Sequence, residues 1–243
     1  MFKELKQALE VLDPYDIEGY LTQLCRLTEG QKIVFSSSLG LEDQLITHVI
    51  SRCELPVEVF TLDTGRLFAE TEALIATTEA HYQRRILRFA PQPDAVKSYE
   101  EAHGINGFYH SVENRKLCCH IRKVEPLNRA LNGAAIWITG LRSGQSSFRQ
   151  GVPLLEEDSE HGLIKFNPLL AWTSQQVRAY IDAKGIPYNP LHDKGFPSIG
   201  CEPCTRAIKP GENERAGRWW WERQNALHQE CGLHLHEERI DKK

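Results

Sequence analysis

Two pairs of cysteines, Cys118-Cys119 and Cys201-Glu-Pro-Cys204, constrain this 243-residue chain more than any other feature. Four thiols that meet in the fold form an S₄ site, which suits zinc or an iron–sulfur cluster. On a helix, the side chains of adjacent residues diverge by roughly 100°, so Cys118 and Cys119 converge poorly on one zinc ion. Binding two different irons would let the thiolates diverge. The spacing therefore favours a cluster, with zinc and unligated thiols as the alternatives.

The composition argues against several classes of protein. A net charge of −4 gives no general attraction to nucleic acid or acidic membranes, so any anionic ligand must be held by local clusters of Arg and Lys. The chain contains no apolar run long enough to cross a bilayer, and its start lacks the apolar core of a signal peptide. Seven unevenly spaced cysteines do not resemble a secreted disulfide framework. We therefore expect a cytoplasmic protein that binds neither nucleic acid nor membrane.

Short apolar runs alternate with amphipathic segments along the chain, and the length suits a single large domain. Strands are predicted at residues 32–35, 57–62, 86–89 and 135–139, with an edge strand at 163–166. Helices are predicted at residues 2–12, 17–27, 44–51, 67–81 and 117–131, and after the capping box that begins at Thr173. This alternation predicts an α/β fold with an open, mainly parallel twisted sheet flanked by helices.

Polar loops follow three of the predicted strands, where open α/β sheets bind ligands. The first is Ser36-Ser37-Ser38-Leu-Gly-Leu-Glu-Asp43, which runs into a helix whose free N–H groups suit an anion; an ordinary strand–helix turn is the alternative. The second is Leu62-Asp-Thr64-Gly65-Arg66. The third runs from Gly140 to Arg149 and includes Arg142; its arginines, glycines and serines are typical of a phosphate or sulfate site or of a flexible solvent loop.

Other candidate residues lie near the cysteines. Lys123 follows Cys119 by four residues and shares its helical face, either beside a bound anion or as a solvated lysine. Arg215 and Arg218 are three apart and would share a face if helical. The three tryptophans that follow predict docking of the C-terminal segment onto the body. Cys231, alone in a polar terminal segment with His234, is a candidate low-pKa nucleophile.

These motifs together resemble the APS/PAPS reductase family, in its iron–sulfur-containing branch of assimilatory adenylyl-sulfate reductases. The resemblance spans nearly the whole chain: Ser36–Asp43, Leu62–Arg66, Cys118-Cys-His-Ile-Arg-Lys-Val-Glu-Pro-Leu127, Thr139-Gly-Leu-Arg142 with Arg149, Cys201–Cys204, Arg215-Ala-Gly-Arg218 and Glu230-Cys-Gly-Leu-His234. It implies an adenine nucleotide alpha hydrolase-like fold. It also implies a nucleotide- and cluster-binding domain at residues 1–227 and a mobile tail at 228–243 that carries the nucleophile.

The resemblance further implies a reaction. The Cys231 thiolate would attack the sulfur of adenylyl sulfate (APS), expel AMP and become an S-sulfocysteine, from which thioredoxin or a glutaredoxin-like reductant would free sulfite. Cys118, Cys119, Cys201 and Cys204 would hold one [4Fe–4S] cluster, and His234 would assist Cys231. The residues that would bind substrate are Ser36, Ser37, Ser38, Asp43, Leu62, Thr64, Gly65, Arg66, Lys123, Gly140, Arg142, Arg149, Arg215 and Arg218.

Several alternatives stay open. The Ser-rich loop resembles the branch that uses the 3′-phosphorylated nucleotide (PAPS), which leaves a preference for that substrate as one alternative. An ATP-using thiolation enzyme with zinc on the four thiols is a second, although the loop lacks the Ser-Gly-Gly pattern expected for gripping pyrophosphate. A non-catalytic redox or iron-sensing module is a third. The sequence leaves homo-oligomerisation undecided.

Overall fold

A six-stranded sheet forms the centre of the computed structural model, which describes residues 1–146 and 149–222. The strands lie in the order β3-β2-β1-β4-β6-β5, and every neighbouring pair is parallel except β5 and β6. Their bounds are β1 (Ile33–Ser36), β2 (Val57–Leu62), β3 (Leu87–Phe89), β4 (Ile136–Ile138), β5 (Leu155–Asp158) and β6 (Leu163–Phe166). The predicted open, mainly parallel sheet is confirmed.

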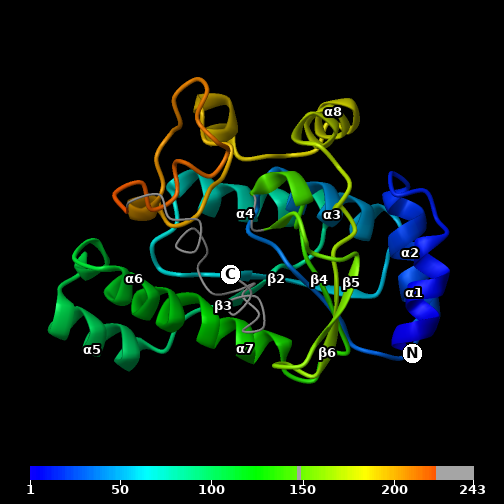
Figure 1. Ribbon diagram of the computed structural model, residues 1–243, viewed down its shortest axis with the longest axis horizontal. Helices are drawn as coiled ribbons and strands as arrows, with labels where there is room; N and C mark the ends of the chain where they lie inside the picture. Colours follow the sequence, from blue (N-terminus) through cyan, green and yellow to red (C-terminus); the bar gives the residue numbers. More distant parts are fainter. Residues whose placement is uncertain (147–148, 223–243) are drawn as a thin grey trace.

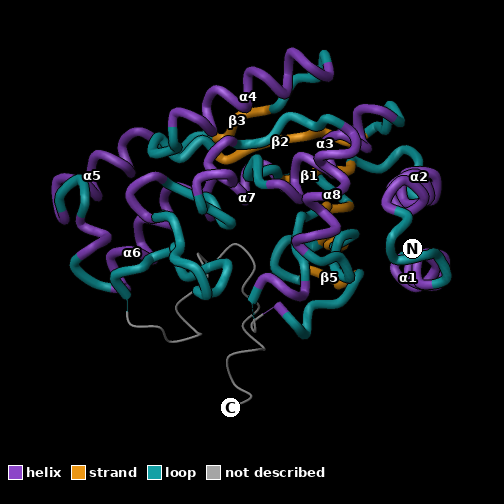
Figure 2. The backbone as a smooth tube through the Cα atoms, turned by 90° about the horizontal axis from the view of Figure 1, so that it is seen from above, coloured by secondary structure: helices purple, strands orange, loops and turns teal. Residues whose placement is uncertain are grey.

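Helices cover both faces of this sheet. Their bounds are α1 (Phe2–Glu10), α2 (Ile17–Leu27), α3 (Leu41–Arg52), α4 (Ala69–Tyr82), α5 (Pro93–His103), α6 (Val112–Cys119), α7 (Glu125–Leu131) and α8 (Ser174–Lys184). Figure 1 shows α3 and α4 above the sheet, α5, α6 and α7 below it, and α8 lying over α3. Figure 2 shows α1 and α2 at the opposite end of the molecule from α5 and α6. Such double coverage explains why the central strands β1 and β4 are almost wholly apolar.

The order of the strands determines where a ligand can bind. From β1 the chain moves outward through β2 to β3, and then returns to place β4 on the other side of β1. The connections after β1 and β4 therefore diverge, which leaves a crevice at the carboxyl ends of these two strands. The loops beginning at Ser37 and Thr139 lie at this crevice, as two of the predicted ligand loops require.

The prediction that residues 163–166 form an edge strand is wrong. That strand, β6, lies between β4 and β5, and all four of its residues are buried. The edge belongs to β5, whose sequence Leu155-Glu-Glu-Asp158 contains a single apolar residue and was not predicted as a strand. Lys165 of β6 is 1% exposed and forms an ion pair with Glu156 of β5 at 3.1 Å, so a cross-strand charge pair stabilises this edge.

The position of Cys118 and Cys119 in their helix also differs from the prediction. They were expected in the first turn of a helix over residues 117–131, but they end α6, which begins after the N-cap Ser111. A π-helical turn, His120–Val124, joins α6 to α7. Pro126, near the start of α7, has no N–H to donate to the carbonyl four residues earlier, which favours a change of hydrogen-bond pattern here.

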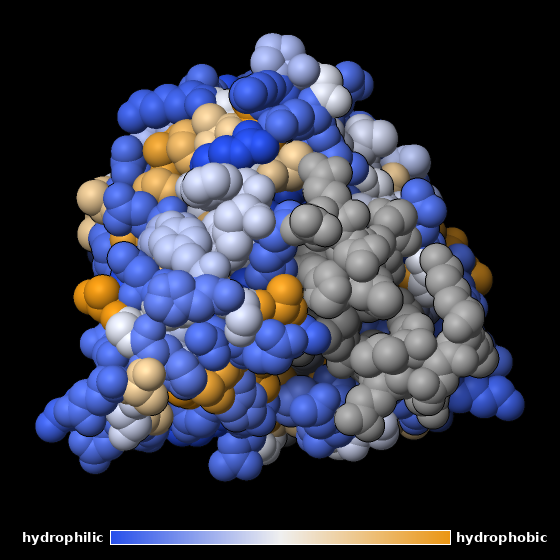
Figure 3. Space-filling model, turned by 60° about the vertical axis from the view of Figure 1, so that its left-hand side comes forward, coloured by the Kyte–Doolittle hydropathy of each residue, from blue (hydrophilic) through white to orange (hydrophobic). Residues whose placement is uncertain are grey.

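Two of the three tryptophans dock the last described segment onto the body, as predicted for this segment. Trp219 is 3% exposed, and the ring centroid of Trp221 lies 4.4 Å from that of Tyr109. Trp220 is 49% exposed. Figure 3 shows that the surface on the side of α5 and α6 is mainly hydrophilic, with hydrophobic side chains scattered in it.

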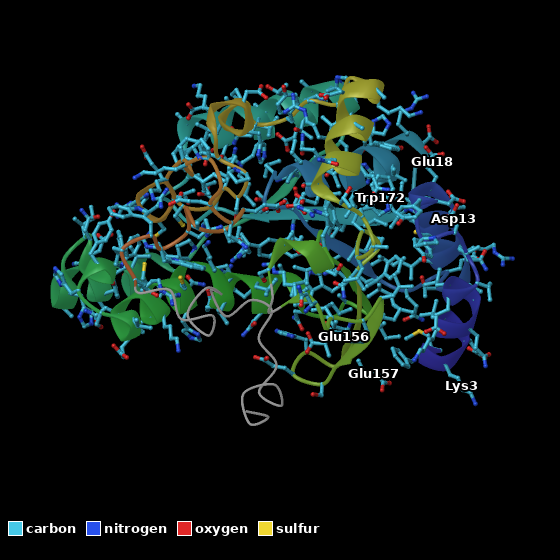
Figure 4. The ribbon with its side chains drawn as sticks, turned by 45° about the horizontal axis from the view of Figure 1, so that its top comes forward. Lys3, Asp13, Glu18, Glu156, Glu157 and Trp172 are labelled. Carbon is cyan, nitrogen blue, oxygen red and sulfur yellow. The ribbon has the colours of Figure 1, made fainter. Side chains whose placement is uncertain are left out.

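Trp172 joins the start of the chain to the segment before α8. Its indole Nε1 donates a hydrogen bond to the carbonyl of Pro14 at 3.1 Å, in the connection between α1 and α2 (Figure 4). Tyr15 packs against the same indole, with 6.2 Å between the ring centroids. Among the described residues, no helix is long and apolar enough to cross a membrane.

Candidate active site

A cavity of about 200 Å³ opens at the carboxyl ends of β1, β2 and β4. Most of the residues predicted to bind substrate lie in its wall, although they are far apart in the sequence. They are Ser36, Ser37, Ser38, Asp43, Leu62, Lys123, Gly140, Arg142, Arg149, Arg215 and Arg218. The topology therefore brings eleven of the fourteen predicted residues to one cavity.

The other three, Thr64, Gly65 and Arg66, lie on the side of the cysteines. The Cys201 thiol donates to the hydroxyl of Thr64 at 3.3 Å. The Arg66 guanidinium donates to the carbonyl of Ile105 at 3.0 Å and to Oδ1 of Asn106 at 2.9 Å. The loop after β2 thus contacts the thiols and the end of α5, while Leu62 reaches the cavity.

The Ser-rich loop is shaped from within by Asp43. One carboxylate oxygen of Asp43 accepts hydrogen bonds from the Ser38 backbone N–H and from the Ser38 hydroxyl, each at 2.6 Å. Leu39 adopts a left-handed backbone conformation, with φ of 61°, at the tip of the loop. Such a conformation costs free energy for a residue with a side chain and persists only where the surroundings fix it. Asp43 therefore positions the loop by hydrogen bonding.

Asp43 is itself buried in a crowded position, at 6% exposed. Burial raises its pKa to about 6, although the hydrogen bonds from Ser38 act in the opposite direction. Gly140, the residue two after β4, provides the necessary room: a Cβ atom there would lie 2.2 Å from Oδ1 of Asp43. A glycine is required here because of this close approach, not because of its backbone dihedral angles.

Arg142 is part of a buried ionic network. Its side chain is 4% exposed, and its guanidinium donates to Glu42 at 2.5 Å and to Glu214 at 2.9 Å. Gln145 also donates to Glu42, at 3.1 Å. The network joins the first turn of α3 to the loop after β4 and to the segment near Arg215. Two carboxylates thus offset the charge of Arg142, so this network chiefly fixes the shape of the cavity wall.

Four further cations line the cavity: Lys123, Arg149, Arg215 and Arg218. Arg149 and Arg215 are 8% and 7% exposed, and Arg149 donates to Oε1 of Gln145. Arg215 lies in a turn and Arg218 in an isolated β-bridge with Thr205, so neither is helical and the helical arrangement considered for them does not apply. A Cβ atom at Gly200 would lie 2.2 Å from the Arg218 guanidinium, so a larger residue there would displace that side chain. This positive lining suits an anion with several negative charges.

The four predicted ligand cysteines gather in one place. Cys119, Cys201 and Cys204 pack with Phe108 and Trp219 in a buried cluster, and Cys118 packs against it. A second cavity among them is also lined by basic residues: Arg66, Arg115, Arg122, Lys123 and Arg218. Burial raises the pKa of the Cys204 thiol to about 12. Burial also acts against ionisation of Cys201, but Lys123, Thr64 and Arg218 outweigh it, so the pKa of Cys201 is lowered.

The chemistry of this donor set can be compared with what an iron–sulfur cluster needs. Four thiols lie together among basic side chains, and thiolates are the ligands that such clusters take. A cluster accepts thiolates that lie farther apart, because each sulfur binds a different iron. The surrounding basic residues also match the negative charge that four thiolates bring. The residues present therefore fit an iron–sulfur cluster.

A buried ion pair joins the cysteine-bearing helix to the end of the described chain. The Arg115 side chain is fully buried, and its guanidinium donates to both carboxylate oxygens of Glu222, at 2.6 and 3.2 Å. It also lies 4.5 Å from the ring centroid of Trp219 and hydrogen-bonds Cys119. The pair thus fixes the point from which the chain continues toward Cys231.

Sequence reasoning missed several residues of the site. Glu42, Gln145, His192 and Glu214 line the main cavity, and Arg115 lines the cavity among the thiols. The position of Arg115, three residues before Cys118, places it on the cysteine-bearing helix and could have suggested a contact. Glu42 and Gln145 lie in the predicted ligand loops Ser36–Asp43 and Gly140–Arg149 but were not singled out. His192 and Glu214 gave no signal, since the cavity forms only in three dimensions. The predicted nucleophile Cys231 and its neighbour His234 lie outside the described residues.

Comparison with known proteins assigns the chain to a family. Residues 32–207 match the model of the phosphoadenosine phosphosulfate reductase domain. The chain belongs to this family. It is 55% identical to the adenosine 5′-phosphosulfate reductase of Agrobacterium fabrum over 220 residues, which cover 90% of this chain and 83% of that protein. It is 54% identical to the enzyme of the same name from Allochromatium vinosum over 217 residues, 89% of this chain and 83% of that protein.

Solved structures agree with this membership. The phosphoadenylyl-sulfate reductase of Candida auris, solved as a phosphate complex, superposes with a TM-score of 0.69 at 28% sequence identity. The match covers 85% of this chain and 96% of that one. Yeast FAD synthetase superposes with a TM-score of 0.53 at 13% identity, covering 84% of this chain and 73% of that one, and shares the fold. The predicted nucleotide alpha hydrolase-like fold is thereby confirmed.

Proposed function

We propose that this chain is an adenosine 5′-phosphosulfate reductase that converts APS to sulfite and AMP in sulfate assimilation. The observation that carries the proposal is a shared wall: Lys123, Cys201 and Arg218 line both the main cavity and the space among the four thiols. An anionic nucleotide in the main cavity would therefore lie beside the thiol site. The identity of more than half of the aligned residues to proteins named as APS reductases supports the same reaction.

In the first step, the thiolate of Cys231 attacks the sulfur atom of APS. A bond forms between the two sulfur atoms, the bond from the sulfate sulfur to the bridging oxygen breaks, and AMP leaves with that bond's electron pair. AMP is a good leaving group, so the main requirement is to neutralise negative charge. Arg149, Arg215, Arg218 and Lys123 would do this around the sulfate and phosphate, with His234 beside the nucleophile.

In the second step, a dithiol reductant such as thioredoxin completes the reaction. One of its thiolates attacks the Cys231 sulfur of the S-sulfocysteine, and sulfite leaves with the electron pair of the sulfur–sulfur bond. The second thiol resolves the mixed disulfide, so the reductant ends as a disulfide and Cys231 as a thiol. The chemistry needs a reducing compartment, and we place it in the cytoplasm.

One [4Fe–4S] cluster would be held by Cys118, Cys119, Cys201 and Cys204. It would keep its oxidation state and supply a fixed charged group behind the cavity wall. Lys123 lines both spaces and would lie between this group and the substrate. Thr64 would hold Cys201 in place through the hydrogen bond at 3.3 Å.

The decisive experiment measures sulfite release by anaerobically purified protein supplied with APS and thioredoxin. We expect turnover, a brown protein, and iron and sulfide close to four each per chain. Substitution of any one of Cys118, Cys119, Cys201 or Cys204 by Ser should bleach the protein, whereas Cys25→Ser, outside the thiol site, should not. A colourless protein with one zinc would refute the cluster, and pyrophosphate release from ATP would indicate a thiolation enzyme instead.

APS is the expected substrate rather than PAPS. The relatives named for APS share 53–55% identity with this chain, whereas the structure named for phosphoadenylyl sulfate shares 28%. We therefore expect a higher kcat/KM for APS than for PAPS. A tenfold preference for PAPS, or about 1.4 kcal/mol of discrimination, would contradict this assignment.

A further inference from the structure

His192 is a partly buried residue whose imidazole has no hydrogen-bond partner in the described part of the chain. It lies on the 3₁₀ turn Pro190–Lys194 after α8 and lines the main cavity. Both of its ring nitrogens are shielded from solvent, and neither makes a hydrogen bond to the described residues. The main chain of Phe196 is near the ring but outside hydrogen-bond geometry. A buried polar group of this kind is rare in native proteins and points to a partner such as a ligand or water.

The turn that carries His192 is fixed in place. Asn189, 1% exposed, donates to the hydroxyl of Thr71 on α4 at 2.9 Å and accepts from the backbone N–H of Leu191 at 3.0 Å. Thr71 also lines the cavity. The imidazole is therefore presented to the cavity by a rigid segment, as expected of a residue that contacts a ligand.

The ring is neutral near pH 7. Burial lowers the pKa of His192, and Arg178 acts in the same direction, whereas Glu42, Asp193 and the Phe196 main chain oppose this. A neutral imidazole has one N–H donor and one acceptor nitrogen. This combination matches a hydroxyl group, which also donates and accepts, better than it matches an anion.

Different kinds of side chain line different parts of the cavity. The cations Lys123, Arg149, Arg215 and Arg218 suit the phosphosulfate. Leu127 and Trp137 belong to the apolar cluster under the sheet and offer an apolar wall suited to the adenine. His192 is linked to the helices on the other face of the sheet: its turn is bonded to Thr71 of α4 through Asn189, and Glu42 of α3 interacts electrostatically with its ring. The other polar groups of APS are the amino group and ring nitrogens of adenine and the two ribose hydroxyls. Only the hydroxyls donate and accept at a single atom, as the pairing with a neutral imidazole requires.

We propose that His192 binds a ribose hydroxyl of the nucleotide and thereby selects a ribose without a phosphate on it. This inference rests on the proposed function, because it assumes an adenosine 5′-phosphate substrate. A ribose phosphate at this position would face a neutral ring, which offers it no positive charge, and Glu42, whose partner Arg142 is already paired with two carboxylates. His192 is thus a specificity-determining residue for APS over PAPS.

The test measures the affinity of four nucleotides by calorimetry: AMP, 2′-deoxy-AMP, 3′-deoxy-AMP and adenosine 3′,5′-bisphosphate. The wild-type protein should bind one of the two deoxynucleotides about five- to tenfold more weakly than AMP. The affinity of His192→Leu for AMP should be lower than that of the wild type by the same factor. This variant should bind AMP and that deoxynucleotide with equal affinity. It should also reduce the preference for AMP over the bisphosphate. His192→Gln, which keeps a donor and an acceptor, should recover part of the affinity and serves as the test if the Leu variant does not fold.

The matched control is His161→Leu. The His161 ring, unlike that of His192, has protein partners, Asp158 at 2.9 Å and Asn128 at 3.1 Å, and it does not line the cavity. We expect its nucleotide affinities to equal those of the wild type. Equal binding of AMP by His192→Leu and wild type, with discrimination intact, would overturn this proposal while leaving the reductase standing. A wild-type protein that neither binds AMP nor releases sulfite from APS would overturn both.

Discussion

The ion pair between Arg115 and Glu222 should stabilise the fold far more than a surface pair does. The side chains of the two residues are 0% and 8% exposed. In Glu222→Gln, the guanidinium stays buried after losing its carboxylate, and removal of one partner from a buried pair costs about 3–5 kcal/mol. The contacts of Arg115 with Trp219 and Cys119 remain, so we expect the lower end, about 3 kcal/mol.

The same chain supplies a control. Arg129 and Glu125, four residues apart on α7, form a pair at 2.7 Å in which each side chain is 37% exposed. Glu125→Gln should therefore cost only about 0.3–0.5 kcal/mol. The double variant Arg115→Met, Glu222→Met should lose less stability than the sum of its single changes, because neither charge is then left buried alone.

The assay is anaerobic urea unfolding followed by circular dichroism, with iron content measured on every variant. A shift in the midpoint at constant slope reports the change in the free energy of unfolding. If Glu222→Gln and Glu125→Gln were equally stable, burial would not be what makes the first pair strong, and the reasoning would be refuted.

Three further predictions concern the site. The pKa of Asp43 is raised from 3.8 to about 6. The protonated carboxyl therefore stabilises the fold fully below pH 3.8, and this stabilisation is lost as the pH rises through 6. Between pH 5 and pH 8 the free energy of unfolding of the wild type should fall by about 1.4 kcal/mol, a loss that Asp43→Asn should not show. If the free energies of unfolding of the wild type and Asp43→Asn in urea changed equally with pH, this prediction would be contradicted. Gly140→Ala should weaken AMP binding and destabilise the fold by about 1–3 kcal/mol through its clash with Asp43, whereas Gly151→Ala, with open space around it, should do neither. Cys231→Ser should keep iron and AMP affinity but lose sulfite release, and wild type without reductant should gain an SO₃ group on Cys231; an adduct on another cysteine would disprove the assignment.

The periodicity of the sequence predicted the fold well because buried parallel strands and amphipathic helices have simple patterns. It failed where other forces decide the structure. The acidic strand β5 pairs through the buried Lys165, and its sequence carries no alternation of apolar residues. The helix that carries Cys118 begins at Val112, since the Ser111 cap sets its start: the Ser111 side chain accepts from the Asn114 N–H. Neither cause is visible in a hydrophobic pattern.

The candidate site was partly predictable for a related reason. Ser38, Arg149 and Lys123 could be proposed because the carboxyl ends of neighbouring parallel strands, and the helices beside them, meet at one edge. The partners within the wall could not, because contacts such as Arg142 with Glu42 join residues that the sequence places far apart. His192 is the extreme case, since only the three-dimensional structure shows that its ring nitrogens are buried and without partners among the described residues.

The two borders of the sheet have a consequence for how the protein behaves when concentrated. A free sheet border exposes unpaired backbone groups that can recruit a strand from another molecule and seed aggregation. One border here, β3, is only three residues long and has Arg88 at its centre. The other, β5, carries Glu156 and the exposed Glu157, both labelled in Figure 4. Short length on one side and negative charge on the other hinder strand addition, so crowding should not convert the folded protein into fibrils.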